Sequence, residues 1–288
     1  MGAAAAAAGA VAATYMMFEA QWPTCRTADL AVLGFPAPWS GLTILHLSDV
    51  HAGLFPTNDR SLAKVVDWAV PLEPDLVFLT GDMLGDPGQS TRTLRLLARL
   101  QPPLGMFAVT GNHEYGLRKD PLAQARDSGS LWAEAGVTLL RDACTALPGR
   151  DGTRIVLCGA DYLTAGFGLL DPDATPGCGY SAPAAAAASP ATGRLAGDFP
   201  ILLVHEPPSA DSPLAALFPL AFAGHTHGGQ LRVPGPWGLR PLVAEEGDFV
   251  AGVYEWGAGR LVVTRGVGTS FLPFRLLTRP EATLWRLV

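Results

Sequence analysis

The sequence predicts an α/β fold in which a sandwich of two sheets is covered by helices. In the first half, apolar runs that end in polar residues alternate with segments of helical periodicity, a pattern typical of parallel strands joined by helices. The second half holds several short strand-like runs with few helices between them, which favours a second sheet. With 288 residues, of which 49% are hydrophobic and 16% charged, the chain can bury a large core.

The expected elements follow in order along the chain. Three buried strands with polar exits are predicted at TILHLSD (43–49), DLVFLTGD (75–82) and LGMFAVTGNHE (104–114). Helices are predicted between them at RSLAKVVDWAV (60–70) and TRTLRLLARL (91–100), because their apolar residues recur at helical spacing. Further strands are predicted at GTRIVLCGA (152–160), FPILLVHE (199–206), LAFAGHTHGG (220–229), QLRVPG (230–235), DFVAGVYEW (248–256), RLVVTRG (260–266) and ATLWRLV (282–288).

The N-terminal segment, residues 1–39, differs from the rest of the chain. It begins MGAAAAAAGAVAATYMMF, carries no charge before Glu19 and lacks the basic start of a typical signal peptide. Because alanine is only weakly membrane-seeking, this apolar lead-in is interpreted as a weak membrane anchor, a signal remnant or a tail. Residues 40–288 are predicted to form a single domain with a low-complexity surface insertion at 181–193.

Charge and cysteine content restrict the possible partners. The net charge of -6 argues against nucleic acid as the main partner, because a phosphate backbone calls for a basic protein face. The four cysteines, Cys25, Cys144, Cys158 and Cys178, are scattered without a CxxC motif, which predicts neither a zinc ribbon nor a disulfide framework. Cys158 lies in the apolar run IVLCGA and is expected to be a small buried residue.

Polar residues follow most of the predicted strands, and five of the six histidines are among them. The carboxyl ends of parallel strands meet at one edge of a sheet, so these side chains are expected to lie close together. They are Asp49 and His51 in SDVH, Asp82 in TGD, Asn112 and His113 in TGNHE, His205 in VHEP, and His225 and His227 in GHTH. The sixth, His46, lies inside a predicted strand and is expected to be a structural residue of the core.

These residue types indicate metal binding. In an extended GHTH segment, His225 and His227 point to the same side, and the flanking glycines let the backbone approach a bound species closely. Aspartate, histidine and asparagine suit borderline divalent ions such as Mn, Fe, Zn or Ni. So many ligands exceed the needs of one ion, and two divalent ions that share a carboxylate are therefore predicted.

Taken in chain order, DxH, GD, GNHE, a later strand-ending histidine and GHTH resemble the motifs of the calcineurin-like metallophosphoesterases. The resemblance spans about residues 43–230 and implies a four-layer αββα sandwich of two mixed β-sheets flanked by helices. Downstream, QLRVP, RGVGTSFLPFR and RPE resemble a bacterial, often membrane-associated branch of the family. Some members of that branch cleave the pyrophosphate of UDP-diacylglucosamine.

The resemblance implies a role for each residue. The ligands of one ion would be Asp49, His51, Asp82 and His227, and those of the second Asp82, Asn112, His205 and His225. Asp82 would bridge the ions, and His113 would protonate the leaving-group oxygen instead of binding metal. Several relatives carry an aspartate three residues after the bridge to orient that histidine; here the position is Gly85. Asp86 or Glu114 could orient His113, or no residue does so.

The leading hypothesis is hydrolysis of a phosphodiester or pyrophosphate by a metal-bridging hydroxide. Asp49, Asp82 and this hydroxide cancel three of the four positive charges of two divalent ions, and the remaining charge attracts a phosphate. A phosphomonoesterase and a cyclic-nucleotide phosphodiesterase are alternatives among enzymes, and a catalytically silent metal-binding scaffold is an alternative of another class. Arg118 and Arg232 are weaker candidates for contacts with phosphate oxygens.

A surface that contacts a membrane is also predicted. The segment TSFLPFRLLTR combines apolar and basic residues, a mixture that suits insertion into an anionic bilayer, although a buried closing strand would have the same composition. The residues are Phe271, Leu272, Phe274, Leu276 and Leu277, beside Arg275 and Arg279. Together with the apolar N-terminus, they predict peripheral membrane association and a lipid-linked substrate, with a cytoplasmic location as the alternative.

Overall fold

Two mixed six-stranded sheets build the body of the molecule. The computed structural model describes residues 2–85, 90–115, 132–133, 135–165, 197–236, 238–242 and 247–288. The first sheet has the order β1-β14-β2-β3-β4-β5, formed by β1 (Thr24–Leu30), β2 (Thr43–Leu47), β3 (Leu76–Thr80), β4 (Met106–Val109), β5 (Val137–Leu139) and β14 (Glu281–Leu287). Because β2, β3 and β4 are parallel neighbours, their exit loops meet at one edge of the sheet.

The second sheet has the order β12-β13-β9-β8-β7-β6. Its strands are β6 (Ala143–Ala146), β7 (Arg154–Gly159), β8 (Asp198–Leu203), β9 (Leu220–Ala223), β12 (Gly252–Trp256) and β13 (Gly259–Val263). The four inner strands are parallel, and β12 and β6 pair antiparallel at the two edges. A separate hairpin joins β10 (Arg232–Gly235) to β11 (Gly238–Pro241). The predicted α/β fold with two mixed sheets is therefore confirmed.

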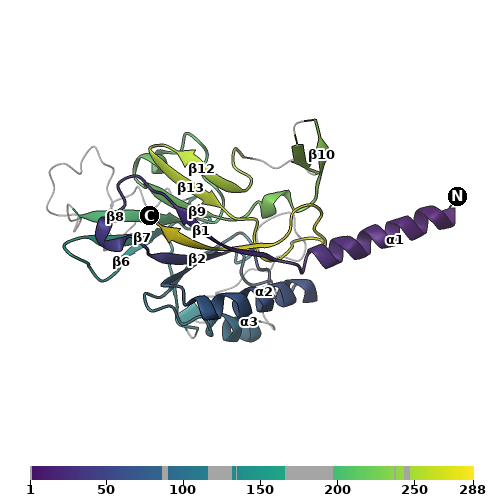
Figure 1. The fold of residues 1–288 in the computed structure, drawn as a ribbon, viewed down its shortest axis with the longest axis horizontal. Helices are drawn as coiled ribbons and strands as arrows, with labels where there is room; N and C mark the ends of the chain where they lie inside the picture. Colours follow the sequence, from purple (N-terminus) through teal and green to yellow (C-terminus); the bar gives the residue numbers. More distant parts are fainter. Residues whose placement is uncertain are drawn as a thin grey trace.

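Helices α2 (Pro56–Ala69) and α3 (Ser90–Leu97) cover the outer face of the first sheet (Figure 1). In α2 the buried apolar residues Leu62, Val65, Val66 and Ala69 recur at the spacing of one helix face. The helix begins four residues before the predicted start because Pro56 occupies its first turn, where a missing N–H costs nothing. Single turns of 3-10 helix occur at η1 (Ala37–Trp39), η2 (Val70–Leu72), η6 (Pro213–Ala216) and η7 (His227–Gly229).

The central core lies between the two sheets. In β2, Ile44 packs toward the second sheet while Leu45 and Leu47 pack toward the helices, so both faces of the strand are buried. His46 lies beside Ile44 and its ring contacts Phe222 edge-on; burial lowers the pKa of this histidine to about 3. Its structural role is as predicted. On the outer face of the second sheet, the described residues include the turn η6 but no α-helix.

The N-terminal helix α1 (Gly2–Glu19) projects from the body (Figure 1). Nearly all its residues are exposed, and only its last turn contacts the fold. There the Arg275 N–H donates to Met16 O at 3.1 Å, and the Thr278 N–H donates to Glu19 Oε1 at 2.7 Å. In the described part of the chain, no helix has the length and apolar character needed to span a membrane. The predicted insertion at 181–193 lies outside the described residues.

A disulfide joins Cys144 of β6 to Cys158 of β7, so the expectation of no disulfide framework is wrong at this pair. The two cysteines are direct partners in the antiparallel ladder. The sequence did not predict the pair because β6 is a four-residue strand without a strong apolar pattern. Cys158 is fully buried, as predicted, and Cys25 is free; Cys178 lies outside the described residues.

Candidate metal centre

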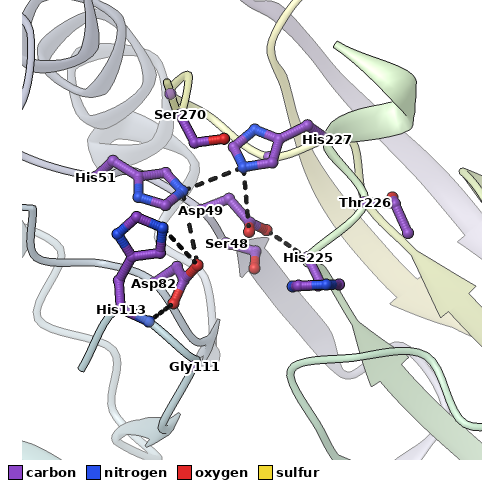
Figure 2. Close-up of polar contacts among 12 residues, drawn as sticks. Ser48, Asp49, His51, Asp82, Gly111, His113, His225, Thr226, His227 and Ser270 are labelled. Atoms are coloured by element: carbon purple, nitrogen blue, oxygen red, sulfur yellow. Dashed lines mark hydrogen bonds and ion pairs between the residues drawn. The ribbon is translucent and has the colours of Figure 1, made fainter. Parts of the chain in front are cut away.

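The exit loops of five strands, three from the first sheet and two from the second, bring the predicted ligands together. Asp49 and His51 follow β2, Asp82 follows β3, and Asn112 and His113 follow β4. His205 follows β8, and His225 and His227 follow β9. Figure 2 shows His51, His113 and His227 arranged around the carboxylates of Asp49 and Asp82, with His225 on the far side of Asp49. The structure therefore brings the residues that were predicted as ligands close together.

One cluster consists of Asp49, His51 and His227, all buried. The Nε2 atoms of His51 and His227 are 3.1 Å apart, and His227 Nε2 is 3.6 Å from Asp49 Oδ1. Ligand atoms bound to one ion at about 2.1 Å lie roughly 3 to 3.4 Å from one another. Asp49 Oδ1 is buried without a hydrogen-bond partner, a costly state for a carboxylate oxygen that a bound cation would relieve. These residues fit a metal ion.

A second cluster consists of Asp82, His205 and His225. His205 Nε2 lies 3.3 Å from Asp82 Oδ2 and 3.0 Å from His225 Nδ1. Asn112 Oδ1 is 3.2 Å from the same nitrogen of His205, which places the predicted asparagine in this cluster. Asp82 Oδ2 is also 3.7 Å from His51 Nε2 of the first cluster. The two clusters therefore share Asp82 as their common carboxylate.

His113 lies against this shared carboxylate. Its backbone N–H donates to Asp82 Oδ1 at 2.8 Å, its ring contacts that of His51 edge-on, and its Nε2 is 3.9 Å from Asp82 Oδ2. His51, Asp82 and His113 are near enough to form a third group able to hold an ion. The predicted proton donor therefore lies at the site, and an experiment must show that it does not bind metal.

Burial and neighbouring charges set the protonation states of these side chains. Burial lowers the pKa of His51 to about 3 and that of His227 well below its usual range, so both imidazoles are neutral and have a lone pair to donate. Burial opposes ionisation of Asp82, yet His205 and His51 hold the pKa of its carboxyl well below its usual range. Burial likewise opposes protonation of His205, but Asp82 raises the pKa of this imidazole to about 10. A divalent ion would replace that proton.

Five of the candidate ligands have left-handed backbone conformations that residues with a side chain rarely adopt. They are Asp49 (φ 52°), His51 (φ 46°), Asp82 (φ 51°), His225 (φ 71°) and His227 (φ 51°). Each such residue costs about 1 to 3 kcal/mol, so the surrounding loops must fix it. Gly111 and Gly224 allow this close packing, because a Cβ at either position would overlap the carboxylate of Asp82 or Asp49.

Glu114 fixes two of these loops. Its buried carboxylate accepts hydrogen bonds from the backbone N–H groups of Asp82 at 2.9 Å and Met83 at 2.9 Å, and from that of Gly111 at 2.8 Å. Burial, followed by the negative charge of Asp82, raises the pKa of Glu114 to about 7. Glu114 therefore ties the β3 and β4 exits together through their amides. The other proposed partner of His113, Asp86, lies outside the described residues, as does Arg118.

The structure describes two arginines for which the sequence suggested a contact, and one of them, Arg275, differs from the expectation. Arg275, expected on a membrane-facing surface, is fully buried behind His227 and cannot contact lipid. Arg232, a candidate phosphate contact, donates to Leu239 O at 2.7 Å within the β10–β11 hairpin. A lone arginine in an apolar segment gives no sign in the sequence of whether its guanidinium faces solvent or buried carbonyls.

Comparison with known proteins agrees with this geometry. The model of the calcineurin-like phosphoesterase family matches residues 42–229. The chain is 31% identical to the uncharacterized metallophosphoesterase YkuE of Bacillus subtilis, covering 88% of this chain and 81% of YkuE. It is 32% identical to the phosphodiesterase YaeI of Escherichia coli, covering 85% of this chain and 82% of YaeI.

A longer relative is a transmembrane protein with metallophosphoesterase domain from Danio rerio, 30% identical over 95% of this chain. The chain spans 60% of the length of that relative. The family match covers all five strand-end motifs and ends at the GHTH loop, and the structure gathers these motifs into two carboxylate–imidazole clusters. The chain therefore belongs to the calcineurin-like phosphoesterase family.

Proposed function

We propose that this metallophosphoesterase hydrolyses a phosphodiester or pyrophosphate bond with two divalent ions, drawn from Mn, Fe, Zn or Ni. The observation that carries the proposal is the shared carboxylate: Asp82 Oδ2 faces His51 at 3.7 Å on one side and His205 at 3.3 Å on the other. When bound, the ions would supply a nucleophile from water at neutral pH and neutralise charge on the phosphate.

The protein's side chains would hold the ions and supply a proton. Asp49, His51 and His227 would hold one ion, and Asn112, His205 and His225 the other, with Asp82 between them. His113 would hold a proton and deliver it to the leaving oxygen, a role that its place beside Asp82 supports. Two intact clusters count against the alternative of a silent scaffold, because a degenerate site would lack ligands.

Three observations support a substrate larger than a phosphomonoester. A cavity of about 410 Å³ is lined by Gly53, two residues after His51, and by Asp59, Arg60 and Arg92. Its two guanidinium groups could donate hydrogen bonds to a second anionic group of the substrate. The E. coli relative is named as a phosphodiesterase. The segments downstream of His227 that resemble the pyrophosphatase branch support a lipid-linked pyrophosphate as one candidate.

A substrate panel tests this proposal. Protein stripped with a chelator and reloaded with Mn, Zn or Fe is assayed on bis(para-nitrophenyl) phosphate, para-nitrophenyl phosphate, a cyclic nucleotide and a nucleoside-diphosphate lipid. We expect activity only after reloading, and turnover of a diester or pyrophosphate about tenfold above that of the monoester, equal to roughly 1.4 kcal/mol in the barrier. Full activity in stripped protein would overturn the two-ion proposal, and preference for the monoester would favour the phosphomonoesterase alternative.

We also propose that the protein acts at a membrane surface. The end of α1 hydrogen-bonds to the loop that precedes β14. Tyr15 and Phe18 of α1, Trp22 just after the helix, and Phe271 and Leu272 of that loop are all exposed. Arg279 stacks on Trp22, with its Cζ 3.8 Å from the ring centroid. Aromatic residues beside basic ones suit the headgroup region of an anionic bilayer. The Danio rerio relative is named as a transmembrane protein.

Vesicle flotation checks the membrane proposal. Replacing Phe271 and Leu272 with serine should lower binding to vesicles of anionic phospholipid by about tenfold or more, because each side chain loses the burial of its apolar surface. Leu33→Ser combined with Val288→Ser is the matched control. Both residues are also exposed, but they follow the carboxyl ends of the parallel strands β1 and β14, whereas the proposed membrane surface precedes the amino ends of these strands. Equal binding of both double variants, or recovery of the intact protein wholly in the soluble fraction, would refute the proposal.

A further inference from the structure

The side chain of Arg275 is fully buried between the metal-ligand loop of His227 and the loop that follows β13. Its guanidinium donates to backbone carbonyls of both loops. The acceptors are Gly268 O (3.0 Å from Nε), His227 O (3.2 Å), Thr278 O (3.1 Å), Arg265 O (2.8 Å) and Gly266 O (3.4 Å). A further contact of 3.3 Å joins Nη2 to Nδ1 of the His227 ring.

This set of partners is unusual for a buried cation. Within the described residues, no carboxylate lies within ion-pair distance of the Arg275 guanidinium, and backbone carbonyls surround it instead. Burying a charge without a counter-ion is costly, so the side chain must return a benefit that a neutral residue would not. That benefit is the satisfaction of loop carbonyls. His227 O and Gly266 O also accept the backbone N–H groups of Gln230 and Glu281, whereas in the described part of the chain Arg275 is the donor to Gly268 O, Thr278 O and Arg265 O.

The loops held by Arg275 carry the first cluster of candidate ligands. Val267 N–H donates to Ser48 O at 2.9 Å and Gly268 N–H to Asp49 O at 2.8 Å, so the segment gripped by the guanidinium runs directly behind Asp49. On its other side the guanidinium holds both the carbonyl and the ring of His227. One side chain therefore fixes two ligands of the same cluster.

We propose that Arg275 is a positioning residue for one ion only, the one assigned to Asp49, His51 and His227. Its guanidinium sets the backbone and ring of His227 relative to Asp49, and none of its contacts described above involves Asp82, Asn112, His205 or His225. This inference rests on the proposed two-ion assignment. Loss of Arg275 is expected to weaken binding of this ion by about 10- to 100-fold, the usual effect of removing a group that orients a ligand, and to leave the second ion in place.

The test measures metal content and not activity. Wild type, Arg275→Met, Arg275→Lys and His227→Ala are dialysed against a graded chelator with Mn or Zn, and bound ions are counted by mass spectrometry. Arg279→Met is the matched control, because it removes a neighbouring arginine that stacks on Trp22 and does not touch His227. Arg275→Met should release one ion at lower chelator than wild type, Arg275→Lys should fall between them, and Arg279→Met should match wild type.

A double variant shows whether Arg275 acts through His227. If it does, adding Arg275→Met to His227→Ala changes metal content no further. If the Met variant does not fold, the Lys variant, which can serve at most three acceptors, replaces it in the comparison. A folded Arg275 variant that keeps both ions, or loses both in parallel, overturns the inference. Retention of both ions by His227→Ala would instead contradict the ligand assignment itself, so the two failures are distinguishable.

Discussion

Asp82→Asn is expected to abolish binding of both ions and to lower hydrolysis by about 10³-fold or more, equal to roughly 4 kcal/mol of barrier. Asp82 is the residue common to the two clusters, with Oδ2 3.3 Å from His205 Nε2 and 3.7 Å from His51 Nε2. Asparagine has nearly the same shape and can still accept the backbone N–H of His113, so the loop is retained. Only the negative charge that holds two cations together is lost.

The measurement combines metal content with turnover on a diester. Asp29→Asn, which neutralises an exposed carboxylate paired with Arg286, controls for the loss of a negative charge. Thermal unfolding of both variants separates loss of metal from loss of fold. Normal metal content and normal turnover in Asp82→Asn would show that Asp82 bridges nothing.

His113→Ala is expected to keep both ions and lose turnover by about 10²- to 10⁴-fold, the range for removal of a positioned proton donor. The side chain lies beside the carboxylate shared by the two clusters, with Nε2 3.9 Å from Asp82 Oδ2. The loss should be largest for substrates with poor leaving groups, because those oxygens depend most on protonation.

The neighbouring variant Asn112→Ala provides the comparison. Asn112 is one residue earlier on the same loop, and its Oδ1 faces His205, so its removal should lower metal content where that of His113 does not. Turnover is measured across a series of aryl diesters of graded leaving-group pKa. A metal deficit in His113→Ala would assign His113 to the cluster with His51 and Asp82 as a ligand, and the proton-donor role would be wrong.

Residues at strand exits were predictable because chain order alone places them at one sheet edge. Asp49, Asp82 and His227 were assigned this way, without knowledge of any contact between them. The hydrogen bonds of Glu114 to backbone amides and the burial of Arg275 among backbone carbonyls were not predicted, because such partners have no signature in a sequence. For Arg275, the composition of its apolar segment suggested a surface position, but the side chain is buried and donates to backbone carbonyls.

The left-handed backbones of the ligands were also beyond prediction. A φ of 52° at Asp49 or 51° at His227 depends on which chain segments press against the loop, and those segments come from distant parts of the sequence. Gly266, whose Cβ would meet the side chain of Asp49, illustrates this dependence across more than two hundred residues of chain. The short sequence motifs indicated the chemistry of the site, whereas its backbone conformation depends on residues that are remote in the sequence.

The place of β14 in the first sheet has a consequence for the route by which the chain folds. β14 lies between β1 and β2, and its contact with β1 joins residues as far as 257 positions apart, as in Arg26 to Thr283. Parallel strands β2, β3 and β4 can assemble over short stretches of chain, whereas β1 has no partner until β14 has arrived. Closing so long a loop costs more entropy than closing the short ones, so we expect β14 to join the sheet late. Until then β2 has one unpaired edge. The loop behind Asp49 precedes β14 directly, and the site therefore takes its final form in the same late step.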